Sequence, residues 1–346
     1  MFYHDASWWG KLLVDEPEKR PSLSSQNAGP ESAHSPVFPE AKSTFLHSFF
    51  VGPDGLRAGW RFAIYLAAFF ALLFLISFVT KPFLHLHPHQ KPPVWVLLLG
   101  ELESLLAAII PALAIARLEK RPFGAYGLPS QGAFGKQFWI GVIWGICAIT
   151  LLLAVMRGVG VFYFGGLALH GARILKFATF WGALFLVVGL FEEFVARGYT
   201  QFTLARGMGF WPAAVLLSAA FGAIHLGNPG EAWVGALAAA CIGLFFCLTL
   251  QRTGTLWFAV GMHASWDWGE SFLYSVPDSG QVAPGHLLSS SFHGARWLTG
   301  GSVGPEGSVL VFVLIAGMWL LFDRLYPTAQ IHHNQLAPVS PAGYQE

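Results

Sequence analysis

Long apolar runs alternate with short polar connections over most of this chain. Between residues 57 and 326, eight runs approach the ~20 apolar residues that a helix needs to cross a bilayer. They cover residues 60–80, 94–116, 138–156, 177–196, 210–226, 232–250, 256–273 and 309–322. Peptide groups find no water in lipid, so such segments must satisfy their hydrogen bonds within helices. The pattern predicts an all-α fold, a polytopic membrane helical bundle of about eight transmembrane helices.

The remaining segments are shorter or polar. Residues 161–169 form an apolar stretch too brief to span a bilayer, which we interpret as a re-entrant segment or a helix end. Residues 1–56 form a polar tail that is rich in Pro, Ser, Glu and Lys from Asp15 to Lys42, and residues 327–346 look similarly unstructured. Such sequences bury too little apolar surface to fold. We therefore expect disordered tails on both sides of a transmembrane domain at residues 57–326.

Composition agrees with a membrane protein. Of 346 residues, 54% are hydrophobic and 11% are charged, against about 25% charged residues in a soluble domain. The formal net charge of +1 gives little attraction for a polyanion. We therefore expect the protein to contact a lipid bilayer and not to bind nucleic acid. Cys147, Cys241 and Cys247 lie in apolar runs without the spacing of a zinc site and are interpreted as small buried hydrophobic residues.

Three ionisable residues end the fourth apolar run. An ionisable group in the membrane costs a few kcal/mol or more and is a functional candidate by default. Glu193 and Arg197 are four residues apart, so they share a helix face and can pair. Glu192 points about 100° away from Glu193, which leaves it free to face a cavity and transfer protons. The alternative is an ordinary salt bridge at the end of a helix.

Two histidines lie in later apolar runs. His225 is four residues after Phe221, and His263 is four residues before Asp267. Each imidazole has a structural alternative, since polar side chains also hydrogen-bond between membrane helices. Taken together with Glu192, these residues place carboxylates and imidazoles on three apolar segments. Such a set can activate a water molecule and stabilise an oxyanion, as amide hydrolysis requires.

Other polar residues carry less information. Glu101 and Glu103 are two positions apart, so at most one can face a shared cavity, and we expect a role in packing or water access. Asn228 and Glu231 follow His225 and can line an entrance, although loop polarity explains them more simply. The His-rich stretch at residues 85–90 is interpreted as a solvated loop.

Three short motifs, EEFVAR (192–197), FGAIH (221–225) and HASWD (263–267), resemble a known pattern. They are similar to the EExxxR, FxxxH and Hxxx(N/D) motifs of the CAAX prenyl protease and bacteriocin-processing (CPBP, or ABI) family. The resemblance covers about residues 120–275, with the protease-like core at about 177–275. It implies an intramembrane glutamic endopeptidase without a metal or other cofactor, acting on a membrane-associated protein or peptide. We expect a multi-pass protein of a bacterial cell (inner) membrane.

The resemblance also implies a role for each matching residue. Glu192 is the base that activates water with help from His225, and Glu193 and Arg197 form the supporting ion pair. His263 and Asp267 form the oxyanion-stabilising pair. The prenyl-protease branch has asparagine where this chain has Asp267, and an ionised aspartate cannot donate a hydrogen bond. Asp267 is therefore protonated, or it orients His263 so that the imidazole donates.

Three alternatives to a glutamic protease remain open. The same carboxylates and imidazoles are suitable ligands for a divalent metal, so a metal-dependent membrane protease is possible, although the chain has no HExxH helix. A non-catalytic membrane scaffold or immunity-type protein would use these groups only for packing. A transporter would use a carboxylate as a proton relay, but the chain has no internal repeat of matching spans.

Overall fold

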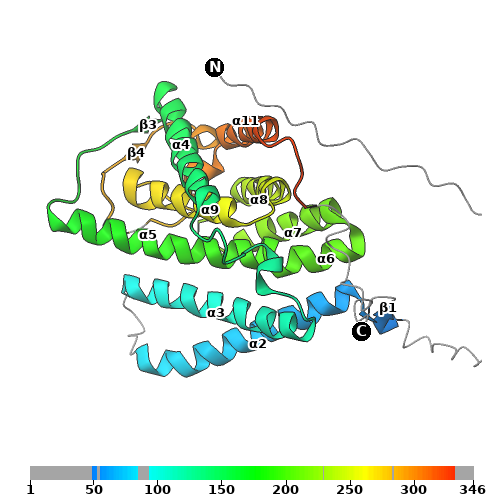
Figure 1. The fold of residues 1–346 in the computed structure, drawn as a ribbon. Helices are drawn as coiled ribbons and strands as arrows, with labels where there is room; N and C mark the ends of the chain where they lie inside the picture. The colour runs from blue at the N-terminus through cyan, green and yellow to red at the C-terminus, as the bar shows by residue number, and fades with distance from the viewer. Residues whose placement is uncertain (1–48, 53–54, 85–92, 229, 283, 332–346) are drawn as a thin grey trace, which may run out of the picture. The chain divides into compact units, whose positions relative to one another are not determined.

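The computed structural model describes residues 49–52, 55–84, 93–228, 230–282 and 284–331 (Figure 1). The His-rich stretch at 85–90 and most of the predicted tails lie outside these residues. Close to the first long helix, β1 (Val51–Gly52) pairs antiparallel with β2 (Gly55–Leu56). At the other end, Ile331 is buried and its backbone N–H donates to the carbonyl of Gln251, so the chain stays packed five residues into the predicted tail.

Helices account for most of the described residues and coincide with the predicted apolar runs. The long ones are α2 (Ala58–Thr80), α3 (Val94–Leu118), α4 (Lys136–Gly158), α5 (Ala172–Glu193), α6 (Thr200–Met208), α7 (Phe210–His225), α8 (Trp233–Thr253), α9 (Trp257–Trp268) and α11 (Val309–Leu325). The short ones are η1 (Lys81–Leu84), η2 (Phe123–Tyr126), η3 (Phe194–Tyr199), η4 (Gly269–Tyr274), α10 (Arg296–Thr299) and η5 (Pro305–Gly307). The predicted all-α membrane bundle is confirmed.

Fewer helices have the length of a full membrane crossing than the eight predicted spans. Five helical segments are long and apolar enough to cross a bilayer: 58–84, 94–118, 136–158, 172–208 and 233–253. The other three predicted spans correspond to α7, to α9 continued by η4, and to α11, which have 16, 18 and 17 residues, fewer than the ~20 that a full crossing needs. The count of eight spans stays a prediction.

The interpretation of residues 161–169 as a helix end is wrong, and the alternative, a re-entrant segment, stays a prediction. Helix α4 ends at Gly158, and Gly160 has a positive φ of 79° that turns the chain out of the helix. The following residues form β3 (Phe162–Tyr163), which pairs antiparallel with β4 (Ser291–Phe292). This short pairing joins the connection after α4 to the one before α10.

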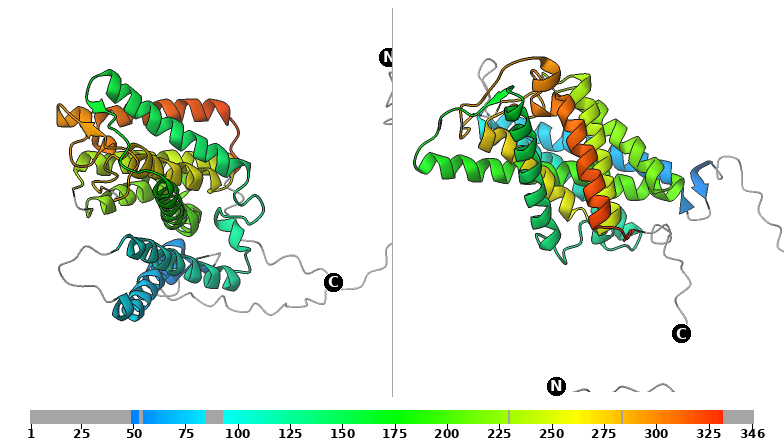
Figure 2. Two further views of the ribbon diagram at one scale, coloured as in Figure 1. Left: turned by 90° about the vertical axis from the view of Figure 1, so that its left-hand side faces the viewer. Right: turned by 90° about the horizontal axis from the view of Figure 1, so that it is seen from above.

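Helix α9 packs against α4, α5 and α8, so it lies inside the bundle (Figures 1 and 2). Glycines allow its backbone to approach α4 closely. A Cβ at Gly141 on α4 would lie 2.1 Å from the carbonyl oxygen of Phe258, and one at Gly261 on α9 would lie 2.2 Å from that of Phe138. The third motif therefore sits on a helix that its neighbours hold on several sides.

Candidate active site

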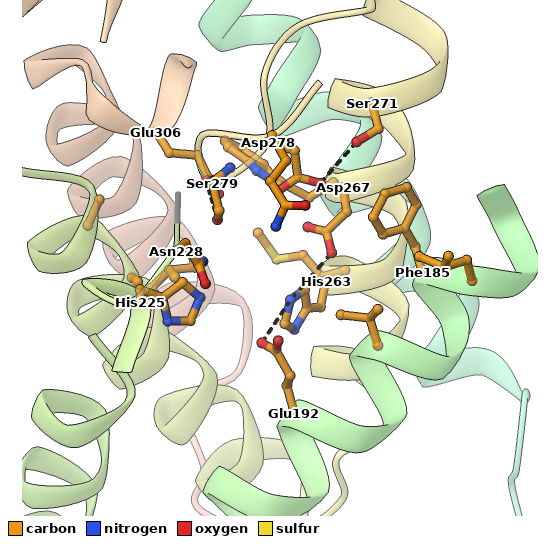
Figure 3. Close-up of a pocket in the computed structure, with 18 of the residues that line it drawn as sticks. Phe185, Glu192, His225, Asn228, His263, Asp267, Ser271, Asp278, Ser279 and Glu306 are labelled. Carbon is orange, nitrogen blue, oxygen red and sulfur yellow. Dashed lines mark hydrogen bonds and ion pairs between the residues drawn. The ribbon is translucent and has the colours of Figure 1, made fainter. Parts of the chain in front are cut away.

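Four of the six predicted site residues border one cavity between the helices. It has a volume of about 310 Å³ and is lined by Glu192, His225, His263 and Asp267. Figure 3 shows Glu192 close to His263, with His225 and Asn228 on the opposite side of the cavity. Residues from α5, α7 and α9 thus meet, although they are separated by up to 75 positions in the chain.

The two adjacent glutamates point in different directions, as their spacing predicts. Glu193 and Arg197 are buried, with 0% and 1% of their side chains exposed, and Arg197 Nη1 donates to Glu193 Oε1 at 2.9 Å. Glu192 is 27% exposed and lines the cavity. The predicted helix end near residue 196 is not observed, because a π-helical segment, η3, carries the chain through a kink at Gly198 into α6.

Arg197 fits into an aromatic recess. Its guanidinium lies 4.2 Å from the ring centre of Phe221 and 5.7 Å from that of Phe246, distances suited to cation–π attraction. Gly243 on α8 makes room for it, since a Cβ there would lie 2.2 Å from Arg197 Nη2. Sequence reasoning missed Gly243 and Phe246, because nothing in the apolar run 232–250 distinguishes them from residues that face lipid.

His263 is oriented by Glu193. Its Nδ1 lies 2.9 Å from Glu193 Oε1, while its Nε2 lies 3.7 Å from Glu192 Oε2 and 3.5 Å from Asp267 Oδ2. A carboxylate only accepts hydrogen bonds, so Nδ1 carries a proton and Nε2 faces the other two carboxylates. The sequence paired Glu193 with Arg197 alone; in the structure its Oε1 accepts from both Arg197 and His263.

His225 bonds within its own helix. Its Nδ1 donates to the carbonyl oxygen of Phe221 at 2.8 Å, and its ring lies against the Phe221 ring with centres 4.5 Å apart. Because Nδ1 is the donor, Nε2 of the neutral imidazole is an acceptor. His225 faces Glu192 across the cavity.

Of the remaining predicted polar residues, two line the cavity and two do not. Glu101 on α3 lines the cavity, whereas Glu103 is buried and accepts a hydrogen bond from Ser77 Oγ at 2.9 Å. Asn228 also lines the cavity. Glu231 accepts a hydrogen bond from the backbone N–H of Ala232 and is not among the lining residues described.

A second group of polar residues, missed by sequence reasoning, borders the cavity from the connection between α9 and α11. Ser271 Oγ donates to Asp278 Oδ2 at 3.1 Å, and both the N–H and the hydroxyl of Ser279 donate to Glu306 Oε2 at 3.0 Å. Burial, with Asp267 and Glu306 nearby, holds the pKa of Asp278 well above its ordinary value. In the sequence these residues are indistinguishable from ordinary loop polarity.

Comparison with known families gives one match. Residues 174–269 match the family model described as type II CAAX prenyl endopeptidase Rce1-like. All three motifs lie inside the matched region, so the family resemblance is confirmed there, over a narrower range than the predicted 120–275. Comparisons with curated proteins and with solved structures gave no match. The matched family is a membrane protease family, in agreement with the five apolar helices of this multi-pass membrane protein.

Proposed function

We propose that the Rce1-like region is an intramembrane endopeptidase that hydrolyses a peptide bond of a membrane-associated protein or peptide near the membrane interface, in a bacterial cell membrane. One observation carries the proposal: Glu192, His225 and His263 face the same cavity from three different helices. Glu192 is the carboxylate open to that cavity, while its neighbour Glu193 is engaged by Arg197 and His263.

In the proposed reaction, a water molecule lies between Glu192 and His225. Glu192 takes one proton from it, and Nε2 of His225 orients it by accepting a hydrogen bond from the hydrogen that stays on the oxygen. The oxygen attacks the carbonyl carbon of the substrate, which becomes tetrahedral and negatively charged on oxygen. Glu192 then gives its proton to the departing amine as the carbon–nitrogen bond breaks, and the carboxylic acid product forms.

His263 is the proposed donor to the oxyanion. Glu193 accepts from Nδ1, so an imidazolium at this position presents its Nε2 proton to the cavity. Glu192, Glu193 and Asp267 surround the ring and favour its positive charge. Asp267 needs no proton of its own in this scheme; as a carboxylate it stabilises the imidazolium that donates.

The experiment that tests the function compares membrane peptides from cells that produce the wild type, Glu192→Gln or Glu103→Gln. Glu103→Gln is the matched control, because it makes the same chemical change in a buried carboxylate that hydrogen-bonds to Ser77. We expect the same cleavage products with the wild type and Glu103→Gln, and their loss with Glu192→Gln. An identical peptide set from all three would contradict the assignment of proteolysis to Glu192.

A further inference from the structure

Three carboxylates that belong to none of the motifs gather beside the cavity. Glu270 comes from η4, Asp278 from the loop that follows, and Glu306 from η5. One oxygen of each lies within 4.8 Å of the other two. Figure 3 shows Asp278 and Glu306 at the side of the cavity away from Glu192.

Glu270 lacks the partners that a buried carboxylate needs. Its side chain is fully buried, and neither of its oxygens has a hydrogen-bond partner in the described part of the chain. The Trp266 indole is close enough to stabilise negative charge, but its geometry falls short of a hydrogen bond. The charged groups that act on Glu270 are the carboxylates of Glu306, Asp278 and Asp267. An uncompensated charge in such a place is strongly unfavourable.

Asp278 and Glu306 are each held by hydrogen bonds to one of their two carboxylate oxygens. Ser271 occupies one oxygen of Asp278, and Ser279 occupies one oxygen of Glu306 through two hydrogen bonds. Hydrogen bonds of this kind orient carboxylates that bind metals. The second oxygen of each carboxylate therefore remains available to a ligand that also reaches Glu270.

We propose that Glu270, Asp278 and Glu306 form a binding site for a hard divalent cation, Ca²⁺. Such a site is made of oxygen donors alone, whereas zinc sites usually include nitrogen or sulfur. Ca²⁺ binds oxygen at about 2.3–2.6 Å, so two ligand oxygens on opposite sides of the ion lie about 4.6–5.2 Å apart. All three oxygens lie within 4.8 Å of one another, so a single Ca²⁺ can contact them. Mg²⁺ demands near-ideal octahedral geometry and usually keeps several waters, which suits a buried group of protein oxygens less well.

The bound ion joins three segments that are distant in the sequence. It ties η4 and η5 to the loop at residues 275–282, next to Asp267 one turn before Glu270. This arrangement fixes one wall of the cavity without placing the ion among the motif residues. The site is thus independent of the proposed proteolytic function.

Cation binding can be measured on the full chain in nanodiscs of zwitterionic lipid after treatment with a chelator. Tb³⁺, a luminescent substitute for Ca²⁺, is excited through nearby tryptophan, and Trp266 is adjacent to the site. We expect saturable Tb³⁺ luminescence that Ca²⁺ displaces at least tenfold better than Mg²⁺. Ca²⁺ at 100 times its Kd should also raise the melting temperature by about 5 °C or more.

Variants assign the signal to the three carboxylates. Glu270→Gln should weaken Ca²⁺ binding at least tenfold, and Glu103→Gln should leave it unchanged. If Glu270→Gln does not fold, Asp278→Asn tests the same site from a less buried position. Glu192→Gln should bind Ca²⁺ as the wild type does, because Glu192 is not one of the three proposed ligands. The cation site is thereby tested separately from the proteolytic function. No displaceable luminescence and no thermal shift in the wild type, or unchanged binding in the folded carboxylate variants, would overturn the site. Equal displacement by Mg²⁺ would overturn the choice of Ca²⁺.

Discussion

Two groups of carboxylates lie at or beside the same cavity and differ in how their charge is balanced. On the motif side, Glu193 accepts hydrogen bonds from Arg197 and His263, so an opposite charge lies beside the carboxylate. On the other side, Glu270, Asp278 and Glu306 approach one another, and Glu270 has no hydrogen-bond partner among the described residues. The first group contains its own cation, Arg197. The negative charge of the second group can be neutralised only by a cation or protons that bind to the chain.

The difference shows what each group is suited to do. A carboxylate with internal partners holds a fixed position and orients the imidazole next to it, which is what a reaction centre requires. A group of carboxylates without a cation has a high affinity for one, and binding the ion stabilises the folded chain. We therefore expect the two groups of carboxylates to respond differently to mutation, pH and calcium.

The largest effect on stability is expected when the motif side loses its cation. Arg197→Met leaves Glu193 buried without the guanidinium, and breaking a buried ion pair in this way costs about 3–5 kcal/mol. The free energy of unfolding, measured by SDS titration, should fall by that amount. Arg324→Met is the control, because Arg324 is exposed near the end of α11 and should change stability by less than about 0.5 kcal/mol. Equal stability of the two variants would contradict the pairing described for Glu193.

A smaller loss of stability is expected when a new side-chain atom crowds the Arg197 guanidinium. In Gly243→Ala the new methyl group would meet Arg197 Nη2 at 2.2 Å, so the arginine must shift. Overpacking of this kind costs about 1–3 kcal/mol, and the displaced arginine should also lower the cleavage rate. Gly317→Ala on α11 meets open space and should be neutral or slightly stabilising. The comparison fails if the two alanine variants have the same unfolding free energy and rate.

The acidic side should respond to pH, most visibly without calcium. Burial, Asp267 and Glu306 raise the pKa of Asp278, while His263 lowers it to a lesser extent. The folded chain thus binds a proton more tightly than the unfolded chain, so this group makes stability fall as pH rises above the ordinary aspartate pKa of about 3.9. Ca²⁺ binds the ionised carboxylate, so the affinity of the site for Ca²⁺ rises as the pH rises over the same range.

Melting temperatures at pH 5 and pH 8 measure this effect. With a chelator present we expect a lower value at pH 8, and with saturating Ca²⁺ we expect that loss to be reversed. Asp278→Asn removes the titrating carboxyl and should flatten the pH dependence in the chelated sample. A chelated wild type that becomes more stable toward pH 8 would refute the uncompensated acidic group.

The features predicted correctly from the sequence arise from local spacing. Apolar runs of helical length predicted the bundle, and the four-residue spacing of Glu193 and Arg197 predicted their contact. Two-residue spacing likewise predicted that only one of Glu101 and Glu103 faces the cavity. In each case, helix geometry alone determines which side chains share a face.

The missed features depend on contacts between distant segments. The contact of His263 with Glu193 joins residues 70 positions apart, and Gly243 matters only because α8 packs beside Arg197. Asp278 and Glu306 lie in connections whose polarity looks ordinary until the fold brings them to Glu270. The strand at 162–163 was missed for the same reason, since its partner lies at 291–292.

The most direct test of the account measures cleavage by purified protein in nanodiscs, with a substrate identified from the peptide comparison and a chelator present. We expect the wild type, while it stays folded, to retain activity in the chelator, because in the proposed mechanism Glu192 and His225 activate the water without a metal. Glu192→Gln should be slower by about 10³-fold, within the range typical of general acid–base catalysis, while Glu103→Gln should match the wild type. Cleavage by Glu192→Gln at the wild-type rate would contradict the central claim, and loss of wild-type activity in the chelator without unfolding would favour a metal-dependent protease.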